Sequence, residues 1–379
     1  MNRIFILFLS LSFFNPLYTQ EKPAPIVTAV PFLSITPDAT SAGMADIGVA
    51  TSPDVYSMAH NCAKYAFVTE KSAIGISYTP WLGNITGDIF LSYANYYHTI
   101  GSGGTIATSM RIFSLGEIEM TDYEGGQIIP LGAYHPFELA LDISYSMRLS
   151  PALSMGVALR YTRSDISSRS DPSTDDFHAG QSFSADLSLY YSSRKYELKK
   201  MKMSFSWGIN IRDIGSRIDY GNSTITSYDY IPTTLSLGGG VHLHHRDKNT
   251  FSFLIETSKL LVPTPRWSDD ENSYTTPDTG LFEGIWDALT YAPGGTREKL
   301  SEYTLQCATQ WEYDHRYALR AGWYYSDPRK DGIQNITLGG SATYKKICAS
   351  VSYTIPIYEE SSTGSSMRIS LCFYLGNKK

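Results

Sequence analysis

The sequence of 379 residues is poor in charge and nearly free of long apolar runs. Charged residues make up 18% of it, below the roughly 25% of a typical soluble protein. The net charge of −6 lacks the basic excess of a nucleic-acid-binding protein, so we expect no nucleic-acid partner. Beyond the N-terminus, no apolar run is long enough for a spanning helix, which excludes a helical membrane protein.

Catalytic and metal-binding signatures are scarce as well. No Gly-rich phosphate loop and no Gly-x-Ser-x-Gly nucleophile motif occurs, so we predict neither an enzyme nor a cofactor. His242, His244 and His245 lack accompanying Cys or carboxylate ligands, and we interpret them as polar residues near the membrane interface, with no metal site. The four cysteines are too few for a disulfide framework. Cys348 and Cys372 face inward on neighbouring predicted strands, where free thiols are favoured over a bridge.

The one long apolar run lies at the start of the chain. Arg3 precedes an apolar stretch from Ile4 to Phe14, and polar residues follow from Glu21. This pattern predicts a secretory signal peptide over residues 1–20, and no Cys follows it that could carry a lipid anchor.

Alternation with a period of two dominates the rest. Over 137–149, Leu139, Leu141, Ile143 and Tyr145 share one face, and small or charged residues occupy the other. Such alternation indicates β-strands, and runs of about 9 to 11 residues have the length that a tilted strand needs to cross a bilayer. About fourteen runs have this character, an even number as in bacterial barrels. They lie near 71–80, 87–97, 104–113, 137–149, 153–163, 182–193, 202–212, 233–244, 250–258, 301–313, 316–325, 334–344, 346–356 and 366–375.

The connections between the runs alternate between short and long, as in transmembrane barrels with short periplasmic turns and long outer loops. A soluble β-sandwich would also alternate, but it has no reason to place aromatic residues at strand ends. A barrel does, because aromatic girdles mark both membrane interfaces. We assign the girdles to Tyr78, Trp81, Tyr97, Tyr161, Trp207, Trp311, Trp323 and Tyr353. The sequence thus predicts an all-β fold, a transmembrane antiparallel β-barrel over 71–379, integral to the cell outer membrane.

The opposite strand face would line the lumen, and it carries nearly balanced charge. We therefore expect internal ion pairs and a filled interior rather than an ion pore. The residues concerned are Arg111, Arg148, Arg160, Arg212, Arg320, Arg368, Glu138, Asp142, Asp186, Glu256 and Glu312.

Residues 21–70 do not alternate, and they carry a family resemblance. The stretches FLSITPDATSAGM (32–44), DIGVATSPD (46–54) and NCAKYAF (61–67) closely resemble the N-terminal region of the PorV family. These are outer-membrane proteins of the type IX secretion system of Bacteroidetes, with the FadL-like barrels as wider relatives. Cys62 and Ala45 depart from the family pattern. Further matches at YTPWL (78–82), FSLGEI (113–118), LRYTRSD (159–165) and APGG (292–295) extend the resemblance over nearly the whole mature chain.

The resemblance implies a fourteen-stranded, FadL-like barrel whose segment 21–70 plugs the lumen. Gly43, Gly48 and Pro37, among small residues, would let irregular backbone pack closely there. The full set of predicted plug residues is Pro37, Asp38, Gly43, Met44, Asp46, Gly48 and Asn61.

The resemblance also implies a role in protein transport. Such proteins bind a large translocon (SprA/Sov-like), receive cargo with C-terminal signal domains and pass it to a surface sortase complex (PorU-like). The alternative is a FadL-like transporter of hydrophobic small molecules, which would need an apolar pocket in the lumen.

The longest outer loop, 259–300, is where we expect partner binding. Its residues Leu281, Phe282, Ile285, Trp286 and Leu289 are spaced as one face of a helix, and Trp267 precedes them. The helix either folds over the barrel mouth as a lid or docks a partner, because helix-in-groove recognition uses such spacing.

Charge separates the two ends of the predicted barrel. The inner turns are basic, with Lys195, Lys199, Lys200, Arg246 and Lys248. The outer loops are acidic. They are solvated, linked through divalent ions to lipopolysaccharide, or placed to steer basic partner surfaces. Lipopolysaccharide and outer-membrane lipid complete the predicted partners. The acidic residues are Glu117, Glu119, Asp122, Glu124, Asp171, Asp175, Asp176, Asp269, Asp270, Glu271, Glu359 and Glu360.

Overall fold

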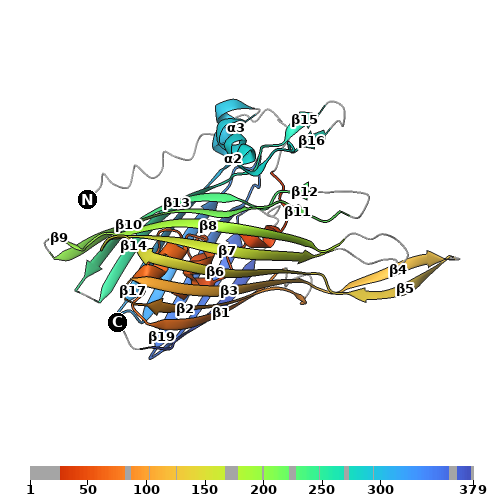
Figure 1. The fold of residues 1–379 in the computed structure, drawn as a ribbon. Coiled ribbons are helices and arrows are strands. Elements are labelled where there is room, and N and C mark those ends of the chain that lie inside the picture. Colours follow the sequence, from red (N-terminus) through yellow and green to blue (C-terminus); the bar gives the residue numbers. More distant parts are fainter. Residues whose placement is uncertain are drawn as a thin grey trace, which may run out of the picture.

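The computed structural model shows a closed barrel of fourteen antiparallel strands (Figure 1). It describes residues 26–81, 87–101, 103–124, 126–166, 178–198, 200–221, 228–246, 248–268, 273–292, 294–357 and 365–376. The predicted signal peptide, the acidic residues of 167–177, 269–272 and 358–364, and Lys199 lie outside these ranges. None of the helices in the described ranges has the length and apolar character needed to cross a membrane.

Each of the fourteen predicted runs is one strand of the barrel. They are β1 (Ser72–Pro80), β2 (Ile89–Ile100), β3 (Gly104–Leu115), β6 (Phe137–Arg148), β7 (Leu153–Asp165), β8 (Gly180–Ser192), β10 (Met201–Gly215), β13 (Thr234–His245), β14 (Asn249–Leu260), β17 (Tyr303–Tyr313), β18 (Tyr317–Tyr325), β19 (Gln334–Tyr344), β20 (Ile347–Pro356) and β21 (Ser366–Tyr374). Neighbours in sequence pair in order, β10 pairs with β13, and β1 pairs with β21, so no barrel strand leaves an edge unpaired. Closure satisfies every strand's backbone groups, which lipid could not do.

Along each strand, side chains face the exterior and the lumen in turn, as the alternation predicts. On β6, Leu141, Ile143 and Tyr145 face outward, whereas Asp142 and Ser144 are buried inside. An apolar exterior and a polar interior are the expected division for a barrel in lipid.

Loop lengths define the two ends of the barrel. The short turns gather at one end, which we take as the inner, periplasmic end, and the long loops at the other, outer end. The outer loops contain β4 (Ile118–Glu124), β5 (Gln127–Tyr134), β11 (Ile218–Asp219), β12 (Tyr228–Asp229), β15 (Arg266–Ser268), β16 (Ser273–Thr275), α2 (Leu281–Thr290) and α3 (Gly295–Ser301). At the inner end β9 (Tyr196–Leu198) pairs with the start of β10.

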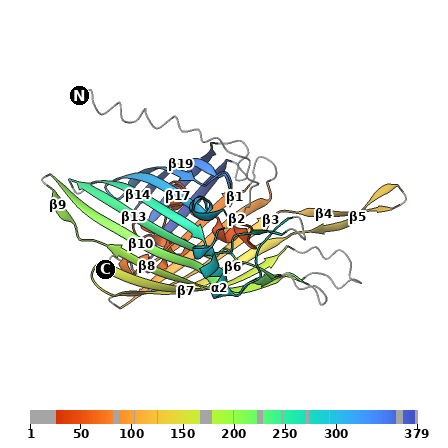
Figure 2. The same ribbon diagram turned by 90° about the horizontal axis from the view of Figure 1, so that it is seen from above.

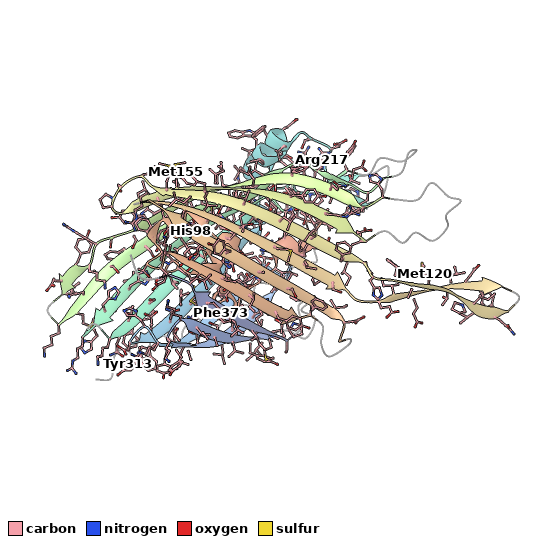
Figure 3. The ribbon with its side chains drawn as sticks, turned by 60° about the horizontal axis from the view of Figure 1, so that its bottom comes forward. His98, Met120, Met155, Arg217, Tyr313 and Phe373 are labelled. Atoms are coloured by element: carbon pink, nitrogen blue, oxygen red, sulfur yellow. The ribbon has the colours of Figure 1, made fainter. Side chains whose placement is uncertain are left out.

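The hairpin formed by β4 and β5 was not predicted from the sequence. This hairpin projects well beyond the barrel rim, as Figure 2 shows, and Met120 on β4 lies outside the barrel in Figure 3. The residues of β5 are nearly all exposed, so neither face has to be apolar and no alternation marks the strand.

Of the eight residues predicted for the aromatic girdles, six face outward, as a girdle requires, and two do not. Tyr78, Trp207, Trp311, Trp323 and Tyr353 are exposed on the outer surface, and Tyr161 contacts the exposed Phe183 there. Tyr97, by contrast, is 2% exposed, because it shares the parity of Tyr93 and points into the lumen. Trp81 follows the end of β1 and packs edge-on against the buried Phe113.

The N-terminal segment, residues 26–70, runs inside the barrel (Figure 1, orange). Its elements are η1 (Pro31–Ser34), α1 (Ala39–Ala42), η2 (Val55–Ala59) and η3 (Cys62–Phe67). It starts at the outer end, where Phe32 packs with Phe113 and Ile231, and reaches the inner end, where Tyr65 packs with Tyr97. The short helices give irregular backbone local hydrogen bonds that the sheet does not supply.

Candidate functional site

Four lumen arginines hold the N-terminal segment by its backbone. Each guanidinium donates a hydrogen bond to a carbonyl oxygen of the segment. The bonds are Arg111 Nη1 to Leu33 O (2.9 Å), Arg148 Nε to Ala66 O (2.8 Å), Arg212 Nη1 to Ala59 O (3.0 Å) and Arg368 Nε to Thr36 O (3.0 Å). Of the lumen charges expected to form ion pairs, these four arginines bind the segment instead, and none of them forms an ion pair within the described ranges. A guanidinium satisfies several carbonyls of a non-helical chain, because its donors form a rigid fork.

One arginine does form the predicted internal ion pairs. Arg160 contacts Asp142 (Nε–Oδ1, 2.5 Å), Asp186 (Nη2–Oδ2, 3.2 Å) and Asp213, and all four side chains are buried. Asp213 was missed from the sequence because it lies at a bulge of β10, just beyond the predicted run. Its backbone has a positive φ of 58°, and its N–H donates to Asp186.

Arg320 binds other strand residues rather than a carboxylate. Its Nε donates to Gln310 Oε1 (2.8 Å) and its Nη1 to Ser341 Oγ (3.1 Å). No ion pair of Arg320 is present within the described ranges. The guanidinium therefore helps to fix the wall of the lumen between β17, β18 and β19.

Glu256 on β14 binds a turn of the segment. Its Oε2 accepts the N–H groups of Gly48 (3.0 Å) and Val49 (2.9 Å). Lys64 is buried beside the same turn and donates to the carbonyl oxygen of Gly48 (2.8 Å) and to Thr51 Oγ1 (2.8 Å). A carboxylate on one side and an ammonium on the other satisfy the backbone groups that this turn would otherwise bury unpaired.

Gly43 touches the barrel wall with its backbone. A Cβ at this position would lie 2.8 Å from the Cα of Gly339 on β19. A Cβ on Gly48 would likewise lie 2.2 Å from the ring of His60. Glycine is required at both positions because of close approach, rather than because of a turn with positive φ.

The remaining predicted plug residues also lie in the lumen. Asp38 is the N-cap of α1, accepts from Ser41 N (2.8 Å) and pairs with His60 Nε2 (2.9 Å). Asn61 caps η3 and donates to Val49 O and Leu189 O. Of the other three, Pro37 is buried, Met44 packs on Ile47 and Leu254, and Asp46 lines a small cavity. That the segment blocks passage through the barrel stays a prediction.

Two polar cavities remain in the lumen. The larger, about 470 Å³, lies at the inner end between residues 51–56 of the segment and the wall, and the smaller, about 180 Å³, lies beside Glu256 and Lys259. His242 and His244 line the larger cavity and contact Ser206, Ser252, Ser204 and Thr250 across neighbouring strands. Cys348 and Cys372 pair in register on its wall, and both are free thiols.

The outer loop predicted to bind partners contains a helix whose large aromatic residues point away from the protein. On α2, Gly284 and Ala288 are buried, and Gly284 lies against Pro263. Phe282 and Trp286 are 78% and 69% exposed. The buried face thus consists of small residues, and the predicted stripe is split: Leu281, Ile285 and Leu289 are half-buried, while Phe282 and Trp286 face solvent with Trp267 also exposed.

Specific contacts fix α2 at the barrel mouth. Arg266 binds the carboxylate of Asp287 with Nη2 (2.8 and 3.0 Å) and lies over the ring of Tyr291. Before the helix, Tyr230 on the β10–β13 loop accepts from Thr279 N (3.0 Å) and lies against Pro277. The exposed aromatic residues are therefore held on an anchored helix rather than on a loose loop.

A second group of ion pairs joins α3 to the β18–β19 loop. Lys330 Nζ lies 3.0 Å from Glu298 Oε1 and 3.5 Å from Glu302 Oε1, and Glu302 also binds Lys259 and Thr264. Burial opposes ionisation of Glu298, but the Gly294 N–H and Lys330 outweigh it and lower the pKa of Glu298. The carboxylate is thus charged at neutral pH and links the β14–β17 loop to the β18–β19 loop.

Comparison with solved structures finds outer-membrane barrels of similar fold. Among solved structures, the toluene transporter TodX of Pseudomonas putida matches with 11% identity and a TM-score of 0.52, covering 90% of this chain and 99% of that one. The TodX deltaS2S3 mutant, a monoaromatic hydrocarbon channel, matches with 11% identity and a TM-score of 0.50, covering 88% and 96%. A Pseudomonas aeruginosa FadL homologue matches with 11% identity and a TM-score of 0.43, covering 93% and 99%. At these identities the likeness extends to the fold alone.

A search of curated proteins found no match. The family model of the type IX secretion system protein PorV, however, matches residues 18–267, well over half of the chain. The strand pattern, the closed barrel and this match agree on an integral outer-membrane protein of that secretion system. The chain belongs to the PorV family.

Proposed function

We propose that this protein binds, at the outer face of the barrel, the partners that the type IX system uses to export proteins. These are a translocon (SprA/Sov-like), the C-terminal signal domains of cargo and the surface sortase complex (PorU-like). The protein would carry cargo between them, and we assign it no catalytic step.

One observation carries the proposal. Phe282 and Trp286 are strongly exposed on a helix that Arg266 and Tyr230 anchor at the outer mouth. Large exposed aromatic residues on a rigid element are typical of binding hot spots, which are enriched in Trp and are held in place before binding.

The fold alone favours another function, transport of hydrophobic small molecules, since TodX is a toluene transporter. Both described lumen cavities are lined mainly by polar side chains, whereas a site for a hydrophobic ligand is predominantly apolar. The apolar clusters around Phe32 and Tyr65 are packed by the segment itself. These features support the secretion role over the transport role.

Affinity purification from the native outer membrane tests the proposal. The double variant Phe282→Ala/Trp286→Ala should lose the translocon or cargo, because each buried aromatic anchor can contribute more than about 2 kcal/mol to binding. Tyr123→Ala/Ile128→Ala is the matched control, since these residues are 72% and 71% exposed on the β4–β5 hairpin.

Heat-modified migration on detergent gels should show that both variants still form a folded barrel. Retention of every partner by a folded Phe282→Ala/Trp286→Ala variant would show that α2 is not the docking surface. Misfolding of that variant would instead identify α2 as a lid that packs on the barrel.

A further inference from the structure

The lipid-facing wall of the barrel is interrupted by an apolar groove near its inner end. The groove has a volume of about 700 Å³ and lies over β17 to β21. Figure 3 labels Tyr313 and Phe373, which belong to the two outermost of these strands.

Small residues in register make the groove. Gly340 on β19 pairs with Leu319 on one side and Val351 on the other, so a residue without a side chain lies between two large ones. One step toward the inner end, Ala342 pairs with Tyr317 and with Ala349.

Packing within the protein does not require a glycine at position 340. A Cβ on Gly340 would have no neighbour closer than 3.9 Å, in contrast to the tight contacts at Gly43. The groove therefore leaves a space that the protein itself does not fill, on a surface that faces hydrocarbon.

A basic turn lies beyond the inner end of the groove. Lys345 and Lys346 form the tight connection between β19 and β20, and both are exposed. Within the described ranges neither lysine forms an ion pair. From Gly340 to Lys345 the strand covers about 17 Å at 3.4 Å per residue, or about 13 Å along the membrane normal at a strand tilt of roughly 40°, comparable with the half-thickness of about 15 Å of a hydrocarbon core.

We propose that this surface is a binding site for one phospholipid of the periplasmic leaflet. An acyl chain would lie in the groove over Gly340, Ala342 and Ala349, and the phosphate would lie on Lys345 and Lys346. The distance from turn to groove suits a chain reaching from the headgroup plane to the bilayer centre. The ammonium groups of both lysines are exposed and complement an anionic phosphate, although Lys345 also lies over the ring of Tyr344 (5.2 Å).

Native mass spectrometry of the full mature protein, titrated with phosphatidylglycerol in detergent, tests this site. The wild-type protein should retain one phospholipid under conditions that strip the others. Gly340→Leu should weaken this binding roughly tenfold, because the new side chain displaces methylenes of the acyl chain from the groove. Lys345→Gln/Lys346→Gln should weaken it about thirtyfold, since each lysine near a lipid surface contributes a factor of about five.

Gly239→Leu is the matched control. Gly239 also faces lipid, pairs with Trp207 and Ile255, and leaves open space at its Cβ, but it lies on β13 away from the groove. Equal retention by wild type and Gly340→Leu, or equal loss in Gly239→Leu, would overturn the proposal. If Gly340→Leu does not fold, the lysine variant decides, because it changes only an exposed turn. Lipopolysaccharide binding with the same dependence on both lysines would also overturn the assignment to a phospholipid.

Discussion

Replacing Arg160 by Met should destabilise the barrel strongly. The guanidinium is the shared partner of Asp142, Asp186 and Asp213, and all these side chains are at most 4% exposed. Methionine would leave three buried carboxylates without a cation. Removing one partner of a buried ion pair costs about 3 to 5 kcal/mol, and three orphaned carboxylates place Arg160→Met at the upper end of that range or beyond.

The assay is the midpoint of guanidinium unfolding in detergent micelles at neutral pH. Arg163→Met provides the control on the same strand, because Arg163 pairs with Asp165 (3.1 Å) on the exposed surface. Such surface pairs contribute at most about 1 kcal/mol. Equal midpoints for the two variants would refute the reasoning that the Arg160 cluster stabilises the lumen. At acid pH the difference in unfolding midpoint between Arg160→Met and wild type should be smaller, since protonated carboxyl groups no longer need the cation.

Three further predictions concern other parts of the molecule. Leu141→Arg on the lipid face should cost about 2 to 4 kcal/mol and reduce the heat-modifiable fraction, whereas Leu131→Arg on the exposed β5 should not. Gly43→Val should loosen the N-terminal segment, since its Cβ would approach the wall at 2.8 Å, and limited proteolysis should then cut residues 26–70 faster while the barrel stays intact. The stabilisation of α3 by Glu298 should be complete above its ordinary pKa of 4.5 and lost as pH falls through the lowered value. The protection factors of the amides of Gly295–Ser301, corrected for the intrinsic pH dependence of exchange, should therefore fall in acid, and this fall should be smaller in Lys330→Met.

The alternation of residues predicted all fourteen barrel strands because lipid outside and polar groups inside impose opposite demands on successive residues. Outside the membrane, successive residues no longer face lipid and lumen in turn, so alternation no longer predicts the strands there. β4 and β5 stand in water, so no alternation marks them. Tyr97 was assigned by residue type, but its parity with Tyr93 and Asn95 shows that it faces the lumen. Parity is therefore a better guide to facing than aromatic character.

The partners of the lumen charges could not be read from the sequence. The pattern placed Arg111 and Arg368 inside, but a carbonyl oxygen has no sequence signature, and the partners lie 78 and 332 residues away along the chain. For α2, the spacing of apolar residues predicted a helix, yet small Gly284 and Ala288 are buried while Phe282 is exposed. Close packing decides which face of α2 is buried, because the small residues Gly284 and Ala288 let the helix approach Pro263.

The course of the first 45 described residues through the lumen also constrains how the protein can assemble. β1 begins directly after the segment and closes the ring by pairing with β21, the last strand made. Ala39 and Thr36 of the segment bind Ser370 and Arg368 of that same last strand. Contacts between the two ends of a chain form slowly, because the whole intervening chain must be ordered first. We therefore expect the pairing of β1 with β21 to close the barrel around the N-terminal segment. Insertion of the segment and this last strand pairing would then occur as a single late step of assembly.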